Sequence, residues 1–223
     1  MKTALIAALL LPLAAWGGES AYQALRIVGE ERSKTLLNNV IEVKGRNGAS
    51  QPDAWTVLLN DPLARGGVRE IEVSKGRIVS ERTPVKAYSG QGEGSLLNFT
   101  LLNLDSDGAF AVAEAEARNA KIGFYGADYL LRSGENGAAP LWVVQLLDRQ
   151  QHSLGSVNIA ADTGAVIEKT FGGKAAKGAW AAGGGLKGRL VRFSDAVGRS
   201  LRHAGGSAEE FLTGERTLDK PGQ

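Results

Sequence analysis

Cysteine is absent from the 223-residue chain, and histidine occurs only twice. Without cysteine there is neither a disulfide framework nor a lipoprotein attachment site. Zinc sites usually draw on several His or Cys ligands, so His152 and His203 alone argue against one, and we expect no metal and no cofactor. A secreted chain without disulfides depends on its hydrophobic core, which is more usual of bacterial envelope proteins than of eukaryotic secreted ones.

A strong excess of charge is also missing. The chain has 26 Lys and Arg residues against 24 Asp and Glu, a net charge of +2. A nucleic-acid binder has to neutralise several phosphates, so we expect no nucleic-acid partner. The composition, 43% hydrophobic and 22% charged, is that of a soluble globular protein with one large or two small domains.

Complete catalytic constellations are missing as well. Residues 152–155, His-Ser-Leu-Gly, resemble part of a nucleophile elbow, but Gln151 stands at the first glycine position and the segment joins two predicted strands. Residues 183–188 match G-x-G-x-x-G, yet no strand precedes them. Residues 105–108 begin like a calcium loop, but the following residues have a helical pattern, so Asp107 is expected to cap a helix. We therefore expect no enzyme.

The first 20 residues have the pattern of a signal peptide. Lys2 supplies the positive end, residues 4–15 are apolar but too short for a bilayer span, and Leu13-Ala14-Ala15 offers a small-residue cleavage site. The expected location is periplasmic or extracellular. The alternative is an uncleaved N-terminal anchor.

One unit occurs twice in the rest of the chain. Gly45-Arg46-Asn47-Gly48-Ala49 matches residues 134–138, Trp55 matches Trp142, and Gly76 matches Gly164, with the copies 87 to 89 residues apart. We assign residues 21–86 and 105–171 to these two copies. A duplicated small unit without reactive residues indicates a binding or scaffolding surface.

The hydrophobic pattern predicts the elements of each copy. In the first, a helix begins after Ser20, and strands cover residues 40–43, 55–59, 68–73 and 77–81. Asn47-Gly48 is predicted to be a tight turn, and Ser74-Lys75-Gly76 is predicted to turn the chain into the last strand. In the second, a helix begins after Asp107 and strands cover residues 129–132, 141–147, 155–160 and 165–169. The predicted fold class is α+β: two repeats of one helix packed on an antiparallel β-meander of about four strands, plus a C-terminal amphipathic helix.

Three further segments join or follow the copies. Residues 87–104 are predicted to be a linker followed by an extended segment that packs against one or both copies, and residues 172–185 a glycine-rich tether. Residues 186–223 are predicted to form a basic amphipathic helix and tail. The apolar stripe of this helix consists of Leu186, Leu190, Phe193, Val197, Leu201 and Ala204.

The second copy resembles the end of a PepSY domain. The resemblance rests on residues 141–148 and 157–167, and it extends roughly over residues 107–169. The first copy is less similar, because Ser74-Lys75-Gly76 stands where Asp162-Thr163-Gly164 stands later. A tandem pair also resembles the β-lactamase-inhibitor-like proteins. The resemblance implies an exported or membrane-anchored module, of the kind found in peptidase propeptides, which binds or restrains a partner protein and has no catalytic residues.

Binding is therefore the predicted role, with the strand edges and the helix–sheet groove of each copy as expected docking surfaces. Trp55 and Trp142 are expected in the core. The loops at residues 61–66 and 148–153 differ between the copies and are further candidates. The predicted binding residues are Trp180, Arg189, Arg192, Arg199 and Arg202.

Two functions remain open. The first is an exported, non-enzymatic module that binds a protein or peptide and regulates or restrains an envelope or secreted peptidase. The second is an envelope scaffold associated with the anionic membrane surface through the C-terminal helix. The apolar stripe of that helix would then contact lipid, whereas in the first case it docks on the rest of the protein.

Overall fold

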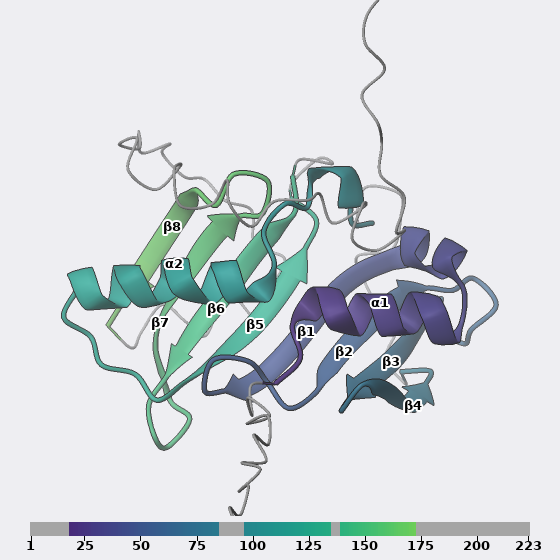
Figure 1. The fold of residues 1–223 in the computed structure, drawn as a ribbon, viewed down its shortest axis with the longest axis horizontal. Helices are drawn as coiled ribbons and strands as arrows, with labels where there is room; N and C mark the ends of the chain where they lie inside the picture. The colour runs from purple at the N-terminus through teal and green to yellow at the C-terminus, as the bar shows by residue number, and fades with distance from the viewer. Residues whose placement is uncertain (1–17, 85–95, 135–138, 173–223) are drawn as a thin grey trace, which may run out of the picture.

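Eight antiparallel strands form one continuous sheet in the computed structural model (Figure 1), which describes residues 18–84, 96–134 and 139–172. The order across the sheet is β4-β3-β2-β1-β5-β6-β7-β8. The strands are β1 (Val40–Gly48), β2 (Trp55–Asn60), β3 (Val68–Ser74), β4 (Arg77–Arg82), β5 (Gly126–Arg132), β6 (Leu141–Leu147), β7 (Ser153–Ala160) and β8 (Val166–Phe171).

The pairing of β1 with β5 corrects the predicted fold class. Val43 lies opposite Leu131 and Gly45 opposite Tyr129, so backbone hydrogen bonds join the two halves of the chain. The prediction of an α+β fold of two repeats, each one helix on its own four-stranded meander, is therefore wrong: the fold is largely β and built on a single sheet. The physical reason is that separate meanders would leave β1 and β5 as edges with unpaired N–H and C=O groups. The predicted C-terminal helix lies outside the described residues.

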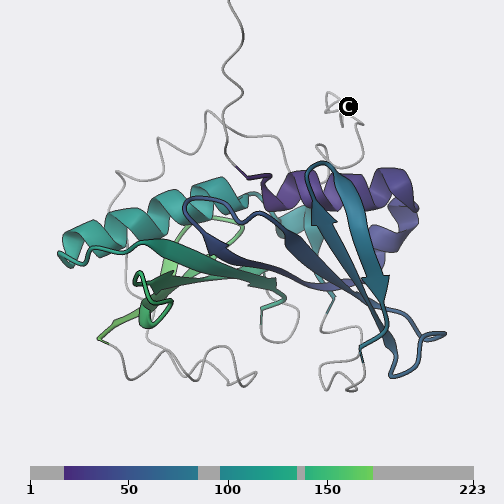
Figure 2. The same ribbon diagram turned by 90° about the horizontal axis from the view of Figure 1, so that it is seen from below.

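Two α-helices, α1 (Ala21–Glu31) and α2 (Ser106–Asn119), cover the same face of the sheet (Figure 2). α1 contacts β2, β3 and β4, whereas α2 contacts β6 and β7. Two short 3-10 helices, η1 (Lys34–Asn39) and η3 (Phe99–Leu101), precede β1 and α2. No α-helix of the described residues lies on the opposite face of the sheet.

The N-terminus of α1 is where the sequence predicts it. The Gln23 backbone N–H donates to Ser20 Oγ at 3.3 Å, and the Ser20 N–H donates to Gln23 Oε1 at 2.9 Å, which makes a capping box. The cap predicted for the second helix is wrong, because Asp105 and not Asp107 is the N-cap of α2. An earlier start places Ser106 on the buried side with Ala109, which extends the stripe that faces the sheet.

The centre of the core contains Trp55, Tyr129 and Trp142, all fully buried. The Trp55 and Trp142 rings meet edge to face, with 6.3 Å between their centroids. Trp55 Nε1 donates to the Glu19 carbonyl at 2.7 Å, and Trp142 Nε1 donates to the Leu104 carbonyl at 2.8 Å. Each indole thereby ties a strand to the residue just before a helix cap. The prediction that both tryptophans belong to the core is confirmed.

Two turn predictions have different outcomes. Asn47-Gly48 is not a tight turn, because both residues belong to β1, at an irregularity in its pairing with β5. Asn47 has a φ of 54°, a left-handed conformation that asparagine tolerates and that suits a bulge as well as a turn. At the β3–β4 connection, Lys75 and Gly76 both have positive φ, 52° and 74°, as a two-residue type I′ hairpin requires.

The segment before α2, which includes the 3-10 helix η3, contacts both halves of the sheet. The Leu97 N–H donates to the Val40 carbonyl at 2.8 Å, and the Leu104 N–H donates to the Ala161 carbonyl at the same distance. Leu97, Leu102 and Leu104 are buried.

Candidate functional site

The binding residues predicted from the sequence, Trp180, Arg189, Arg192, Arg199 and Arg202, lie outside the described residues, as do residues 1–17 of the predicted signal peptide. The helix–sheet groove, another predicted docking surface, is filled by the buried core between the helices and the sheet. The space between the helices and the sheet is therefore closed to a ligand.

The two loops that differ between the copies are closed by their own aspartates. Asp61 Oδ1 accepts a hydrogen bond from the Leu63 N–H, and Asp61 Oδ2 pairs with Arg69 at 2.7 Å. Asp148 Oδ1 accepts from the N–H groups of Gln150 and His152, both at 2.8 Å. These contacts hold the pKa of Asp61, mainly through Arg69, and of Asp148, mainly through the His152 backbone, below its usual range. Both carboxylates serve loop structure.

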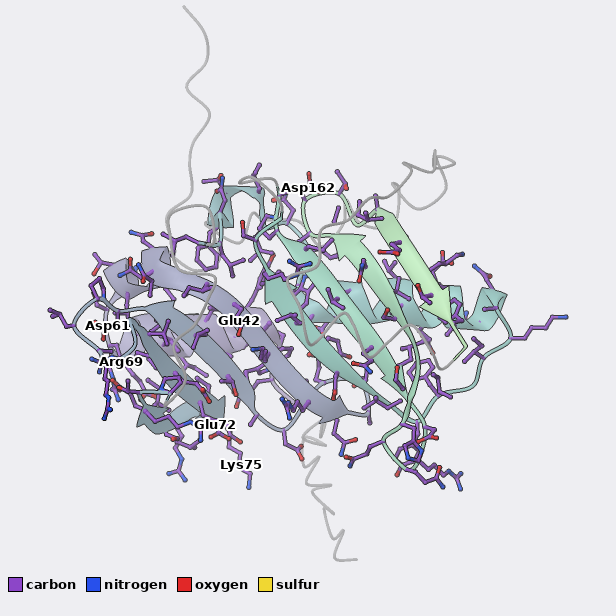
Figure 3. All side chains as sticks on the ribbon, turned by 180° about the vertical axis from the view of Figure 1, so that it is seen from behind. Glu42, Asp61, Arg69, Glu72, Lys75 and Asp162 are labelled. Atoms are coloured by element: carbon purple, nitrogen blue, oxygen red, sulfur yellow. The ribbon has the colours of Figure 1, made fainter. Side chains whose placement is uncertain are left out.

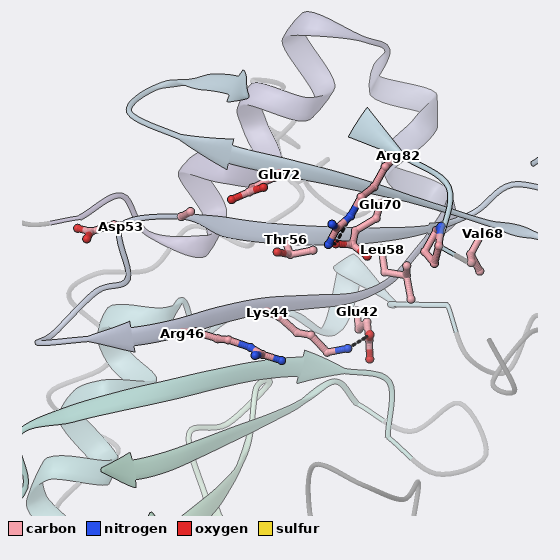
Figure 4. Close-up of a pocket in the computed structure, with 12 residues that line it drawn as sticks. Glu42, Lys44, Arg46, Asp53, Thr56, Leu58, Val68, Glu70, Glu72 and Arg82 are labelled. Atoms are coloured by element: carbon pink, nitrogen blue, oxygen red, sulfur yellow. Dashed lines mark hydrogen bonds and ion pairs between the residues drawn. The ribbon is translucent and has the colours of Figure 1, made fainter. Parts of the chain in front are cut away.

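A polar groove of about 650 Å³ lies across β1–β4, on the face opposite the helices (Figure 3). Figure 4 shows its lining side chains, most of which project from the four strands. We call this hollow the polar groove. The residues that line it are Glu42, Lys44, Arg46, Asp53, Ala54, Thr56, Leu58, Val68, Glu70, Glu72, Arg82 and Pro84.

Strand alternation and register assemble this lining. Side chains two residues apart on a strand share a face, which brings Glu42, Lys44 and Arg46 of β1 into the polar groove. Glu42 lies opposite Leu58, which lies opposite Glu70. The β1–β2 pairing is irregular between Val40 and Glu42. Ile41, at this irregularity, packs with Leu58 and Val68 in a small apolar cluster and not in the main core.

The charges of the polar groove are partly compensated within it. Lys44 pairs with Glu42, and Arg82 Nε donates to Glu70 Oε1 at 3.1 Å (dashed lines in Figure 4). The bond to Glu70 raises the pKa of Arg82. Arg46, Asp53 and Glu72 also line the groove, and none of the three forms an ion pair with another described residue. One positive and two negative groups of the groove thus have no ion-pair partner among the described residues, although the charge of Glu72 also contributes to the raised pKa of Arg82.

The side chains of the polar groove are charged, hydroxyl-bearing or aliphatic. Its lining contains no His, Cys, Ser or Tyr and no aromatic ring. Within residues 18–84, 96–134 and 139–172, no group of three or more His, Asp or Glu side chains is placed to hold a metal ion. The groove offers charged and hydroxyl groups for hydrogen bonds and ion pairs on an extended surface.

Sequence reasoning missed the polar groove, although its signals are present. Glu42, Lys44 and Arg46 alternate along one strand, and Glu70 and Glu72 along another, which indicates solvated strand faces. Alternation does not reveal which strands are neighbours, so the hollow that these faces form together could not be found from it.

The most elaborate polar cluster lies between the two helix N-termini. Asp105 Oδ1 accepts from the N–H groups of Tyr22 at 3.1 Å and Ser106 at 2.6 Å. Ser106 Oγ accepts from the Ala21 N–H at 3.0 Å and donates to Gln51 Oε1 at 2.7 Å. Burial raises the pKa of Asp105, against the lowering effect of these hydrogen bonds. Because N–H groups of both helices donate to the Asp105 carboxylate, this cluster links the N-termini of α1 and α2.

No family model matches the chain, and no curated protein matches it. A solved structure of a candidate lipoprotein from Clostridium difficile is similar, with 9% sequence identity, a TM-score of 0.46, and coverage of 64% of this chain and 88% of that one. None of the described helices is long and apolar enough to cross a membrane.

Proposed function

We propose that this protein is an exported, non-enzymatic binding module that holds an extended segment of a partner polypeptide in the polar groove. The observation that carries the proposal is the lining of the groove: paired and unpaired charges of both signs spread over four strands. The signal-peptide pattern of residues 1–20 supports export to the periplasm or beyond.

The lining favours a polypeptide over a small molecule. Pockets for small molecules are mostly apolar and aromatic, with a few polar groups, even where their volume is similar. The polar groove has seven charged side chains among its lining residues, four acidic and three basic, and no aromatic ring. A partner with charges of both signs matches this surface, because electrostatic complementarity orients a partner and excludes wrong ones.

The spacing of the lining favours an extended partner. Side chains on one strand face recur about every 7 Å, and neighbouring strands lie about 4.8 Å apart. A polypeptide in an extended conformation presents alternate side chains at the same repeat, so its successive charges can meet alternate lining side chains of one strand, such as Lys44 and Arg46 of β1. The resemblance of residues 107–169 to PepSY domains supports a peptidase as the partner, which the module would restrain by occupying a segment of it.

Site-specific crosslinking tests this proposal, because the chain has no cysteine of its own. Thr56→Cys places a label in the polar groove, whereas Glu114→Cys places one on α2, on the other face of the sheet. After labelling with a photoreactive maleimide, each full mature chain is illuminated in envelope extract. We expect adducts with a protein partner from position 56 and not from position 114.

A charge reversal completes the design. Arg46→Glu in the Thr56→Cys background should remove the adducts, because it reverses a charge that lines the groove. Arg46 is exposed and forms no ion pair with another described residue, so we expect the variant to fold. Equal adducts from both labelled positions, or adducts that survive Arg46→Glu, would refute the proposal that a partner binds in the polar groove. If the partner identified is not a peptidase and the adducts behave as expected, polypeptide binding stands and restraint of a peptidase does not.

A further inference from the structure

One apolar side chain stands clear of the protein on the loop between β2 and β3, residues 61–67. Leu63 is 96% exposed, more than any other large hydrophobic residue of the described ranges. Single exposed apolar residues are common on protein surfaces and carry no meaning by themselves, so the surroundings of Leu63 decide its role.

Hydrogen bonds hold this loop in a fixed shape. The Asp61 N–H donates to the Gly67 carbonyl at 3.0 Å, and the Leu63 N–H donates to Asp61 Oδ1 at the same distance. Asp61 Oδ2 accepts from Arg69 Nε at 2.7 Å, and Arg69 pairs in turn with Glu81 of β4. Because the loop is ordered before a partner arrives, covering Leu63 would require little further loss of conformational entropy.

The loop at the corresponding place in the second half, residues 148–152, is closed in the same way. The Asp148 N–H donates to the His152 carbonyl at 2.9 Å, and the Gln150 N–H donates to Asp148 Oδ1 at 2.8 Å. Gln150 thus occupies the position of Leu63, two residues after the aspartate. Since the same closure accommodates a polar residue, the structure of the loop does not require leucine at 63. A leucine that folding does not require, on an ordered and exposed loop, indicates an anchor for a partner.

The β2–β3 loop lies where the polar groove ends. Both strands that it joins line the groove, and Val68 of the lining follows the loop directly. Figure 4 shows Val68 at one end of the groove and Arg46 at the other. A segment that runs along the strands from Arg46 therefore leaves the groove beside the loop. The loop also carries the exposed Arg65, whose charge favours an acidic neighbour in the partner.

We propose that Leu63 is the apolar anchor for the polypeptide held in the polar groove, and that Arg65 pairs with an acidic side chain beside that contact. This inference rests on the proposed function and states the chemistry of the partner. The segment carries charges of both signs along the groove and continues past Val68 into apolar residues next to an acidic one. The apolar residues cover Leu63.

Peptides displayed on phage supply a probe for this contact. Random peptides are selected on the immobilised full mature chain, and the most enriched sequence is synthesised with a fluorescein label. Its Kd is then measured by fluorescence anisotropy for the wild type and for Leu63→Gln, which installs the residue that the second loop carries. We expect Leu63→Gln to weaken binding at least about tenfold, as the loss of an apolar anchor does. The matched control, Gln150→Ala, should leave the Kd unchanged.

A charge exchange tests the second contact. Arg65→Glu should weaken binding of the selected peptide, and replacing the acidic residue of the peptide by lysine should restore it. Leu63→Gln should leave the midpoint of urea unfolding unchanged, because surface substitutions away from buried contacts have little effect on stability. A weaker Kd would then report a lost contact and not a loss of folded protein.

The same assay separates the anchor from the groove. Binding that falls with Arg46→Glu but not with Leu63→Gln would overturn the anchor and leave the proposed function standing. Binding that falls with Leu63→Gln but not with Arg46→Glu would overturn the proposed function, and with it the inference that one segment covers both surfaces. Selection of no peptide, or of a peptide unaffected by either change, would overturn both.

Discussion

Asp105 joins the two α-helices, and its removal is expected to weaken both. Asp105→Ala deletes the N-cap of α2, which costs about 1 kcal/mol. It also leaves the Tyr22 N–H of α1 without its acceptor, which costs about 1 to 3 kcal/mol for a buried donor. Together the loss is about 2 to 4 kcal/mol, and the relief of burying a carboxylate moves it toward the lower end.

Urea unfolding followed by far-UV circular dichroism measures this loss. With a denaturant slope of about 2 kcal/mol/M, the midpoint should fall by about 1 to 2 M. Asp105→Asn keeps an acceptor oxygen at the same place, so its loss should be about half as large or less. Asp107→Ala is the matched control, since Asp107 lies in the first turn of α2 and contributes at most about 1 kcal/mol through the helix dipole.

The stabilities of Asp105→Ala and Asp107→Ala together test whether Asp105 is the N-cap of α2. If Asp107→Ala destabilised the protein as much as Asp105→Ala, the cap would be at the position expected from the sequence and the joint between the helices would not exist. The raised pKa of Asp105 adds a second check. A raised pKa means that this carboxyl favours the folded state most at acid pH and less as pH rises through its folded value. Asp105→Asn should remove that contribution.

Three further predictions concern the rest of the sheet. Trp142→Phe keeps an aromatic ring but leaves the carbonyl before the α2 cap without a donor, so unfolding in urea should show a loss of about 1 to 3 kcal/mol. Gly155→Ala would place a Cβ 2.3 Å from a backbone oxygen of β8, so the same measurement should show a loss of at least about 1 kcal/mol, and an unchanged midpoint would contradict that contact. Arg69 lowers the pKa of Asp61 and Glu81 in the folded protein. These carboxylates therefore stabilise the fold at pH values above their pKa in the unfolded chain, about 4, and lose that effect as the pH falls through their folded pKa. The midpoint difference between wild type and Arg69→Gln should therefore shrink below about pH 4, and a difference that persists there would refute the ion-pair account.

Local elements of this protein follow well from its sequence. The Ser20 cap, the strand that begins at Trp55 and the hairpin at Lys75-Gly76 all depend on contacts within a few residues, and the structure has them where the pattern predicts. Asn47-Gly48 shows the limit of such signals. The same dipeptide fits a turn or a bulge, and the choice depends on the pairing of β1 with β5.

The sequence by itself determined the existence and approximate places of the eight strands and of α1 and α2, and the membership of Trp55 and Trp142 in the core, because periodicity and propensity act along the chain. Only the tertiary structure decided that β1 and β5 join two meanders into one sheet, that Asp105 serves both helices, and that side chains from four strands enclose a polar groove. These features depend on which distant segments become neighbours. That choice is made by satisfying edge hydrogen bonds and burying apolar faces across the whole molecule, and a local pattern does not contain it.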